Sequence, residues 1–504
     1  MLNSTLDRAA ALIARGCAMD ALTLTTPLAA SASANVNVLG AHAAALKAVG
    51  DHEAALETDR RAVAGFPTSA VAWHNLAATL GDMGRLAEAC DAVAQAQARG
   101  LDASETWVVL GRALGGLGDL AGGEEALREA LLRAPRNSAL ASELAEFIWT
   151  GRGALDDALG ILRRATADGA AAAPLVLREA GLLAAAGRPE TALSQLLAVA
   201  AAVPDEAAYV LPLSDGLLKA GRLGEALDLA RRAAARQPSA PAVLCQLANV
   251  QSACGRPSEA MTAARAGLAV DPASQPLLNA LATAARLAGD PLYGDLCDHD
   301  AMVGVFEIER PAAWRTLGGY LADLALALDR SIRTIRHPSD QSLQGGGQTS
   351  FRLSGSPEPA IQAFFHAADA PIRTHMAALG AGSDPLRRRN ADDYRLSGAW
   401  SVRLARGDYH RDHIHSEGWL SSAFYVETPD AALAGPRREG WLRFGQPAFQ
   451  TDPELKADHH VRPQPGRLVL FPSYMWHGTE PFHTDERRLT IAFDLVPTAL
   501  RGPR

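Results

Sequence analysis

Apolar residues in the first 297 positions recur with the i, i+3, i+4, i+7 spacing of amphipathic helices. A glycine phrase, clearest as GRLAEA, GRPETA, GRLGEA and GRPSEA, interrupts this pattern at intervals of 34 residues, with one interval of 35. Glycines at such regular intervals predict pairs of helices, each pair joined by a glycine turn. The phrase begins at nine glycines: Gly16, Gly50, Gly84, Gly118, Gly153, Gly187, Gly221, Gly255 and Gly289.

Two further positions repeat with the glycine. A small residue five places later lets the second helix of a pair pack closely on the first, and a proline seventeen places later often ends that helix. Because one pair cannot bury its apolar faces alone, the pairs are expected to stack into an all-α solenoid over residues 1–297. The small residues are Ala21, Ala55, Ala89, Gly123, Ala158, Ala192, Ala226 and Ala260, and the prolines are Pro67, Pro135, Pro204, Pro238 and Pro272.

The pattern changes after residue 297. Helical stretches over 310–333 and up to Leu379 flank a glycine-rich segment, QSLQGGGQTS, over 341–350. From Ala399 onward, apolar and polar residues alternate with period two in five runs separated by turn residues, as in a β-sandwich or barrel. We therefore expect an α+β domain over residues 298–504, with strands in AWSVRLA, WLSSAFYVE, GWLRFG, GRLVLFPS and RRLTIAFDLV.

Composition supports two kinds of domain and excludes some functions. Eleven of the 14 histidines follow residue 297, whereas all five cysteines precede it, scattered and without a CxxC pair. This cysteine usage predicts a reducing, cytoplasmic environment. The net charge of -8 argues against nucleic-acid binding. No apolar run is long enough for a membrane span, and the first residues do not resemble a signal peptide.

Three histidines lie within six positions in GDYHRDHIHSEGW. If this segment is a strand, His413 and His415 project to one side, while His410 and Asp412 face the other. His477 follows the apolar run LVLFPSYMW and completes a candidate set of three metal ligands. The sequence suggests that His410 lies at the rim of the site. It also predicts that the pair His459 and His460 lies in a solvated turn, and that Trp419 and Tyr425 pack in the core.

Arg488 and Thr490 begin the last apolar run and share one strand face. A guanidinium and a hydroxyl that point into a barrel are suited to binding one carboxylate. Arg487 is the alternative anchor, but on a strand it points outward.

Two resemblances follow from these motifs. Residues 2–297, with Trp73, Leu76 and Ala77 in register, resemble the tetratricopeptide repeat (TPR) family, which implies a protein or peptide ligand in the groove of the array. Residues from about 300 to 497 resemble the 2-oxoglutarate/Fe(II)-dependent oxygenases found behind such repeats in bacteria. The matching stretches are HIHSEGWLSSAFYV, PGRLVLFPSYMWHGTEPF and RRLTIAFDLVP, with HPSDQSLQGGGQT upstream.

The second resemblance implies a double-stranded β-helix (jelly-roll) that uses Fe(II), 2-oxoglutarate and O2, usually for hydroxylation. His413, His415 and His477 would be the iron ligands, and Arg488 and Thr490 would bind the distal carboxylate of 2-oxoglutarate. Most of the wider superfamily has Asp or Glu at the position of His415. Glu417 or a water molecule is the candidate to complete the metal shell.

Two other functions stay open at this point. Residues 407–415 also read G-x5-H-x-H, which begins a cupin pattern and suggests a three-histidine dioxygenase without 2-oxoglutarate. In that reading Arg488 has no role, and the expected acidic residue is absent. The other alternative is a TPR scaffold whose barrel has no activity.

Overall fold

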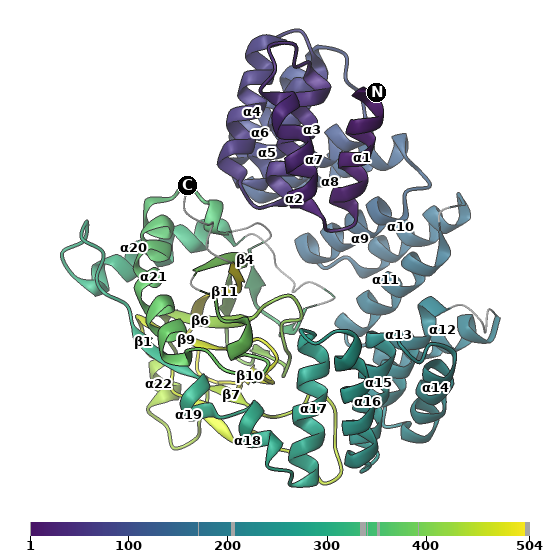
Figure 1. Ribbon diagram of the computed structural model, residues 1–504, viewed down its shortest axis with the longest axis vertical. Helices are drawn as coiled ribbons and strands as arrows, with labels where there is room; N and C mark the ends of the chain where they lie inside the picture. Colours follow the sequence, from purple (N-terminus) through teal and green to yellow (C-terminus); the bar gives the residue numbers. More distant parts are fainter. Residues whose placement is uncertain are drawn as a thin grey trace. The chain divides into compact units, whose positions relative to one another are not determined.

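The computed structural model describes residues 2–169, 171–202, 207–332, 339, 341–349, 353–391 and 393–498. Their contacts divide the chain into two compact units, residues 1–144 with 351–357, and residues 145–350 with 358–504. The division falls inside the helical array, so the second unit contains both array helices and the β-domain (Figure 1). The predicted domain boundary at 297/298 stays a prediction.

The N-terminal part of the chain is the predicted array of helix pairs. All nine repeat glycines have positive φ, between 65° and 93°, which places each of them in a left-handed turn inside a pair. The small residue of each repeat is buried in the second helix, as expected for close helix packing. Helices α4 and α14 end two residues before Pro67 and Pro238, as the repeat predicts, while Pro204 lies outside the described residues.

The array helices have the following bounds: α1 Leu2–Ala14, α2 Ala18–Ala29, α3 Val36–Ala48, α4 His52–Gly65, α5 Ala70–Asp82, α6 Leu86–Ala98, α7 Ser104–Leu117, α8 Leu120–Arg133, α9 Ser138–Arg152, α10 Leu155–Ala167, α11 Ala172–Ala185, α12 Pro189–Ala202, α13 Ala207–Lys219, α14 Leu223–Arg236, α15 Pro241–Ala253, α16 Pro257–Val270, α17 Gln275–Ala288 and α18 Leu292–Leu296.

An antiparallel β-domain follows the array. A six-stranded sheet has the order β1-β9-β6-β11-β4-β3, a three-stranded sheet has the order β10-β7-β8, and β2 pairs with β5. This arrangement is consistent with a jelly-roll, and the five predicted strands correspond to β4, β6, β7, β9 and β11. The strands are β1 Gly304–Glu307, β2 Leu343–Gln344, β3 Gly347–Gln348, β4 Asp393–Leu404, β5 Tyr409–His410, β6 Leu420–Glu427, β7 Leu442–Phe444, β8 His459–Val461, β9 Arg467–Pro472, β10 His477–Thr479 and β11 Arg488–Thr498.

Helices α20 (Leu317–Ser331) and α21 (Pro359–Leu379) cover one face of the six-stranded sheet (Figure 1). Phe364 of α21 packs on Phe424 of β6, with ring centroids 4.6 Å apart, and also meets Phe493 of β11. Because side chains alternate along a strand, this packing leaves the opposite face of β11 for polar residues. The short helices of the domain are α19 His299–Met302, α22 Asp430–Leu433 and η2 Arg387–Arg389, whereas η1 Leu353–Gly355 belongs to the first compact unit.

Helix α17 packs directly against the β-domain inside the second unit. The Asn279 amide donates to the Tyr474 carbonyl at 2.9 Å, and the Trp476 indole donates to the Thr283 hydroxyl at 3.0 Å. The Tyr474 hydroxyl in turn donates to the Leu296 carbonyl at 2.7 Å. These buried hydrogen bonds explain why the last array helices and the sheets form one compact body.

One sequence expectation is corrected by the fold. His459 and His460 do not lie in a solvated turn but in strand β8, where His459 stacks on His299 with ring centroids 4.9 Å apart. The glycine-rich segment is a tight connection between β2 and β3 over its described residues, and its upstream match begins at positions outside them. Among the described residues, no helix has the length and apolar character needed to cross a membrane.

Candidate metal centre

The three predicted ligands lie together at one end of the β-domain. Their ring centroids are 4.1 Å apart for His413 and His477, 5.1 Å for His413 and His415, and 5.0 Å for His415 and His477. One ring nitrogen from each histidine lies within 4.8 Å of the other two. The site therefore has the spacing that a single ion requires, with only small movements of the rings.

Backbone pairing brings the histidines together. His413 and His477 form an antiparallel bridge, with N···O distances of 2.9 and 3.1 Å, and the His415 amide donates to the Ser473 carbonyl at 3.0 Å. The predicted strand through His415 is wrong, because β5 ends at His410 and only the bridge continues. Pairing with residues 473–477, rather than strand alternation, sets the direction of these side chains.

Hydrogen bonds at Nδ1 orient each ring. His413 Nδ1 lies 2.8 Å from the Arg411 carbonyl, and His477 Nδ1 lies 3.0 Å from the Met475 carbonyl. Carbonyl oxygens only accept, so Nδ1 carries the proton in both rings and the Nε2 lone pair is free for a metal. Burial lowers the pKa of His413 to about 3 and the pKa of His477 well below its usual value, which keeps both imidazoles neutral.

The third ring is oriented by a carboxylate that the sequence analysis did not identify. His415 Nδ1 donates to Asp494 Oδ1 at 2.6 Å, and the Ser421 hydroxyl donates to the same oxygen at 2.7 Å. Asp494 is buried, and its alternation with Arg488 and Thr490 on one strand was the signal that could have found it. The Asp494 carboxylate therefore supports the His415 ring from the Nδ1 side and leaves Nε2 to face the other two histidines.

The distance between two Nε2 atoms is a test of the fit to a metal. His413 Nε2 and His415 Nε2 lie 3.2 Å apart. Metal–imidazole bonds of about 2.1 Å at right angles separate adjacent nitrogens by about 3.0 Å. Three imidazole ligands suit iron, copper, nickel or zinc. The donor set therefore fits a transition metal and leaves positions for further ligands.

Arg488 and Thr490 line the same cavity, whose volume is about 390 Å³. Arg488 is 3% exposed, and its guanidinium lies over the Tyr425 ring at 5.0 Å. Its Nε is buried and has no hydrogen-bond partner among the described residues. Because an unpaired buried donor is costly, this atom indicates a place for an acceptor such as a carboxylate.

One face of β11 carries the polar half of the site. Arg488, Thr490, Ala492 and Asp494 all line the cavity, at intervals of two residues. The alternate residues, such as Phe493, pack against helix α21. This strand therefore supplies a carboxylate-binding end and a histidine-supporting end on one straight face.

The remaining candidates lie around this site. His410 does not face away as expected, because its ring lines the cavity 5.6 Å from that of His413, and its Nδ1 lies 3.0 Å from the Ser342 hydroxyl. Asp412 points away and forms a two-point ion pair with Arg443, at 2.8 and 2.9 Å. Glu417 lines the cavity from an exposed turn, outside the group of close metal donors.

The other aromatic and basic candidates are also placed. Trp419 is buried, as predicted, and its indole donates to the Leu386 carbonyl at 3.0 Å. Tyr425 is buried as well, but it also contacts Arg488, a role that core packing alone did not suggest. Arg487 points outward and forms ion pairs with Asp329, at 2.7 Å, and with Glu427.

A comparison with protein families agrees with this geometry. Residues 398–494 match the family model described as "Putative 2OG-Fe(II) oxygenase". Residues 398–494 of the chain are therefore similar to this oxygenase family. The matched segment runs from β4 to Asp494 and includes the three histidines, Arg488 and Thr490. No curated protein matches the chain.

Solved structures of repeat proteins are similar to parts of the chain. YrrB, a TPR protein with an unusual peptide-binding site, is 20% identical, covers 34% of this chain and 88% of its own, with a TM-score of 0.27. Pseudomonas aeruginosa pilF is 18% identical, covers 41% and 94%, with a TM-score of 0.32. The APC/C hetero-tetramer Cut9–Hcn1 is 18% identical and covers 56% and 55%, so the chain spans about half of that protein, with a TM-score of 0.32. These scores are low, and the repeat architecture follows from the 34-residue period and the helix pairs.

Proposed function

We propose that the domain predicted at residues 298–504 is a 2-oxoglutarate- and Fe(II)-dependent oxygenase that hydroxylates a C–H bond of a polypeptide. His413, His415 and His477 are the proposed iron ligands, and Arg488 with Thr490 is the proposed site for the distal carboxylate of 2-oxoglutarate. The observation that carries this proposal is the convergence of three imidazoles and one unpaired guanidinium nitrogen in a single cavity. An inert barrel has no need for a buried cation aimed into such a cavity.

Charge balance supports 2-oxoglutarate in particular. Fe(II) and the dianion of 2-oxoglutarate cancel, and the Asp494 carboxylate cancels the Arg488 guanidinium, so the buried charges of the loaded cavity sum to zero; Glu417 lies in an exposed turn at its edge. Since the Asp494 carboxylate accepts a hydrogen bond from His415 Nδ1–H, it makes that imidazole a more basic metal ligand. Asp494 thereby compensates for the neutral residue at the position that is usually Asp or Glu.

The side chains of the cavity have separable tasks. Iron, 2-oxoglutarate and O2 supply the oxidising chemistry when they are bound. Arg488 and Thr490 orient the co-substrate, with Tyr425 supporting the guanidinium from below. Phe471 and Trp400 form apolar walls that limit the access of water. Glu417, in its exposed turn, is the residue best placed to meet an incoming substrate.

The helical array is proposed to bind a protein or peptide. Stacked helix pairs form an extended concave surface, which is the usual recognition surface of repeat proteins. We propose that the chain acts in the cytoplasm, because its five cysteines are all unpaired.

Anaerobic titration of the full chain with Fe(II) and 2-oxoglutarate tests the proposal. A chelate of iron and the keto acid gives a weak visible charge-transfer band, and we expect this band with the wild-type chain. His413→Ala should abolish it. His483→Ala is the matched control, because His483 is an exposed histidine outside the cavity, and it should leave the band unchanged.

Each other result identifies an alternative. Iron binding without any effect of 2-oxoglutarate on the spectrum would favour a three-histidine dioxygenase of the cupin type. A chain that binds neither iron nor 2-oxoglutarate would be a scaffold, and the proposed function would be wrong.

A further inference from the structure

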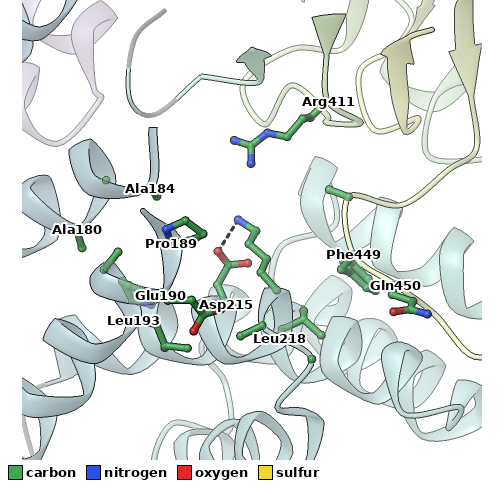
Figure 2. A pocket seen from close by; sticks show the side chains of 18 of the residues that line it. Ala180, Ala184, Pro189, Glu190, Leu193, Asp215, Leu218, Arg411, Phe449 and Gln450 are labelled. Atoms are coloured by element: carbon green, nitrogen blue, oxygen red, sulfur yellow. Dashed lines mark hydrogen bonds and ion pairs between the residues drawn. The ribbon is translucent and has the colours of Figure 1, made fainter. Parts of the chain in front are cut away.

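A second, larger cavity lies beside the metal centre within the C-terminal compact unit. Its volume is about 1370 Å³, and it is lined by helices α11 to α14 and by residues 448–454 of the β-domain. Figure 2 shows Arg411 facing this groove, with Pro189, Glu190 and Asp215 on the helical side and Phe449 and Gln450 on another wall. Most small-molecule sites have volumes of about 300–1000 Å³, so this groove suits a longer occupant.

Strand β5 separates the groove from the metal cavity. Tyr409 and Arg411 line the groove, whereas His410 between them lines the metal cavity. Gln341 lines both cavities. The groove and the metal cavity therefore adjoin at Gln341.

Several small residues line the helical side of the groove. They are Gly181 and Ala184 of α11, Gly216 of α13, and Ala220 directly after α13. Small residues let the backbone of an extended chain lie close to the helices. The metal cavity, at about 390 Å³, has room for the co-substrate and about one side chain, but not for a folded surface.

The unpaired charges of the groove are mainly acidic. Glu190, Asp452 and Glu454 are exposed in it, and none forms an ion pair with another described residue. Lys219 and Asp215 neutralise each other at 2.7 Å, as Figure 2 shows by a dashed line. Arg411 is the opposing charge on the β-domain side. Three carboxylates against one guanidinium favour a basic occupant.

We propose that this groove binds an extended polypeptide segment rich in lysine or arginine and presents one of its side chains to the metal cavity past Gln341. The presentation of a side chain to the metal cavity rests on the proposed oxygenase function, whereas the binding of the peptide in the groove does not. The groove, rather than the metal cavity, then selects the substrate.

Fluorescence anisotropy with the full chain tests the binding. The probe is a fluorescein-labelled peptide of about ten residues, alternating Lys and Ala, which spans about 33 Å when extended. The reference is the same peptide with Glu in place of Lys. We expect tighter binding of the lysine peptide, and weaker binding of it at high salt.

A charge-matched pair of variants locates the effect. The combination Glu190→Gln, Asp452→Asn and Glu454→Gln should weaken binding of the lysine peptide about 10-fold. The combination Glu125→Gln, Asp228→Asn and Glu309→Gln removes the same charge from exposed positions outside the groove and should change it less than about 2-fold. Replacing Phe449 with p-benzoylphenylalanine should give a photo-crosslink to the lysine peptide.

The proposal is overturned if the two peptides bind equally, if neither binds, if the two triple variants behave alike, or if no crosslink forms at position 449. The iron titration separates this outcome from a failure of the oxygenase function. The groove variants should keep the charge-transfer band, and His413→Ala should keep peptide binding. Loss of only one of these signals identifies which of the two proposals fails.

Discussion

The helical array and the metal cavity are built from contacts of very different range. In the array, each helix packs mainly on its neighbours in the chain, and the same glycine turn joins every pair. In the cavity, His415 is supported by Asp494, 79 residues away, and Arg488 lies over Tyr425, 63 residues away. In the array, stability is distributed over many similar helix contacts. In the cavity, each functional side chain is held by only a few specific contacts. We therefore expect substitutions in the cavity to have larger and more specific effects than substitutions in the array.

The largest effect is expected at the guanidinium. Arg488→Leu should weaken 2-oxoglutarate binding by about 100-fold or more, because it removes a buried charge that pairs with the carboxylate. Iron binding should persist, since Arg488 is not a proposed ligand. Titration of the charge-transfer band with 2-oxoglutarate measures both quantities.

Arg487→Leu is the control for this prediction. It removes the adjacent guanidinium, which forms ion pairs on the outside of the sheet. We expect a change of less than about 3-fold in 2-oxoglutarate affinity, as is usual for exposed pairs. Equal effects of the two variants would contradict the assignment of Arg488.

A smaller effect is expected at the carboxylate that supports His415. Asp494→Asn keeps the shape of the side chain but removes its charge, and should weaken Fe(II) binding about 10- to 100-fold. Ser421→Ala removes a hydrogen bond to the same oxygen and keeps the charge, so it should have a clearly smaller effect. Anaerobic metal competition measures both affinities. No change in the affinity of Asp494→Asn would mean that the carboxylate has only a structural role.

Substitutions in the helical array should change the free energy of unfolding rather than the binding of iron and 2-oxoglutarate. Ala226 is fully buried in α14, so Ala226→Leu should overpack the helix pair and lower the free energy of unfolding by about 1–3 kcal/mol. Ala235→Leu, at an exposed position of the same helix, should change it by less than about 0.5 kcal/mol. Chemical denaturation measures the difference, and the charge-transfer band should be unchanged in both variants. A loss of the band in Ala226→Leu would break the distinction between the two regions.

The last expected effect is a pH dependence in the core of the β-domain, and it is absent at neutral pH. His375 of α21 is 3% exposed and packs edge-on against Phe306, and burial lowers its pKa to about 4. Between pH 6.5 and 4 the unfolded state binds a proton that the folded state does not. Stability should therefore fall on acidification by about 1.4 kcal/mol per pH unit from this group.

His375→Leu should reduce this slope between pH 6.5 and 4. His366→Leu is the control, because His366 is exposed on the same helix and should leave the slope unchanged. Denaturation at several pH values gives the slopes. Parallel curves for wild type and His375→Leu would show that His375 titrates normally in the folded state.

The accuracy of the predictions from the sequence also depends on how far apart along the chain the contacting residues lie. The helix pairs and five strands follow from periods of 3.6 and 2 residues, which act over short distances along the chain. The strand through His415 was wrong, because a turn after His410 and a bridge to His477 replace regular alternation. The placement of His459 and His460 was wrong because strand β8 forms only by pairing with β7.

By itself, the sequence determined the repeating helix pairs, the sheet-forming runs and the residue types of the candidate site. The spacing of Arg488 and Thr490 on one strand also belongs to this local information. Only the tertiary structure decided that Asp494 supports His415, that Tyr425 lies against Arg488, and that β5 separates the metal cavity from a groove lined by array helices. These relations join segments that are distant along the chain, and antiparallel pairing and helix packing bring such segments together only in the folded state.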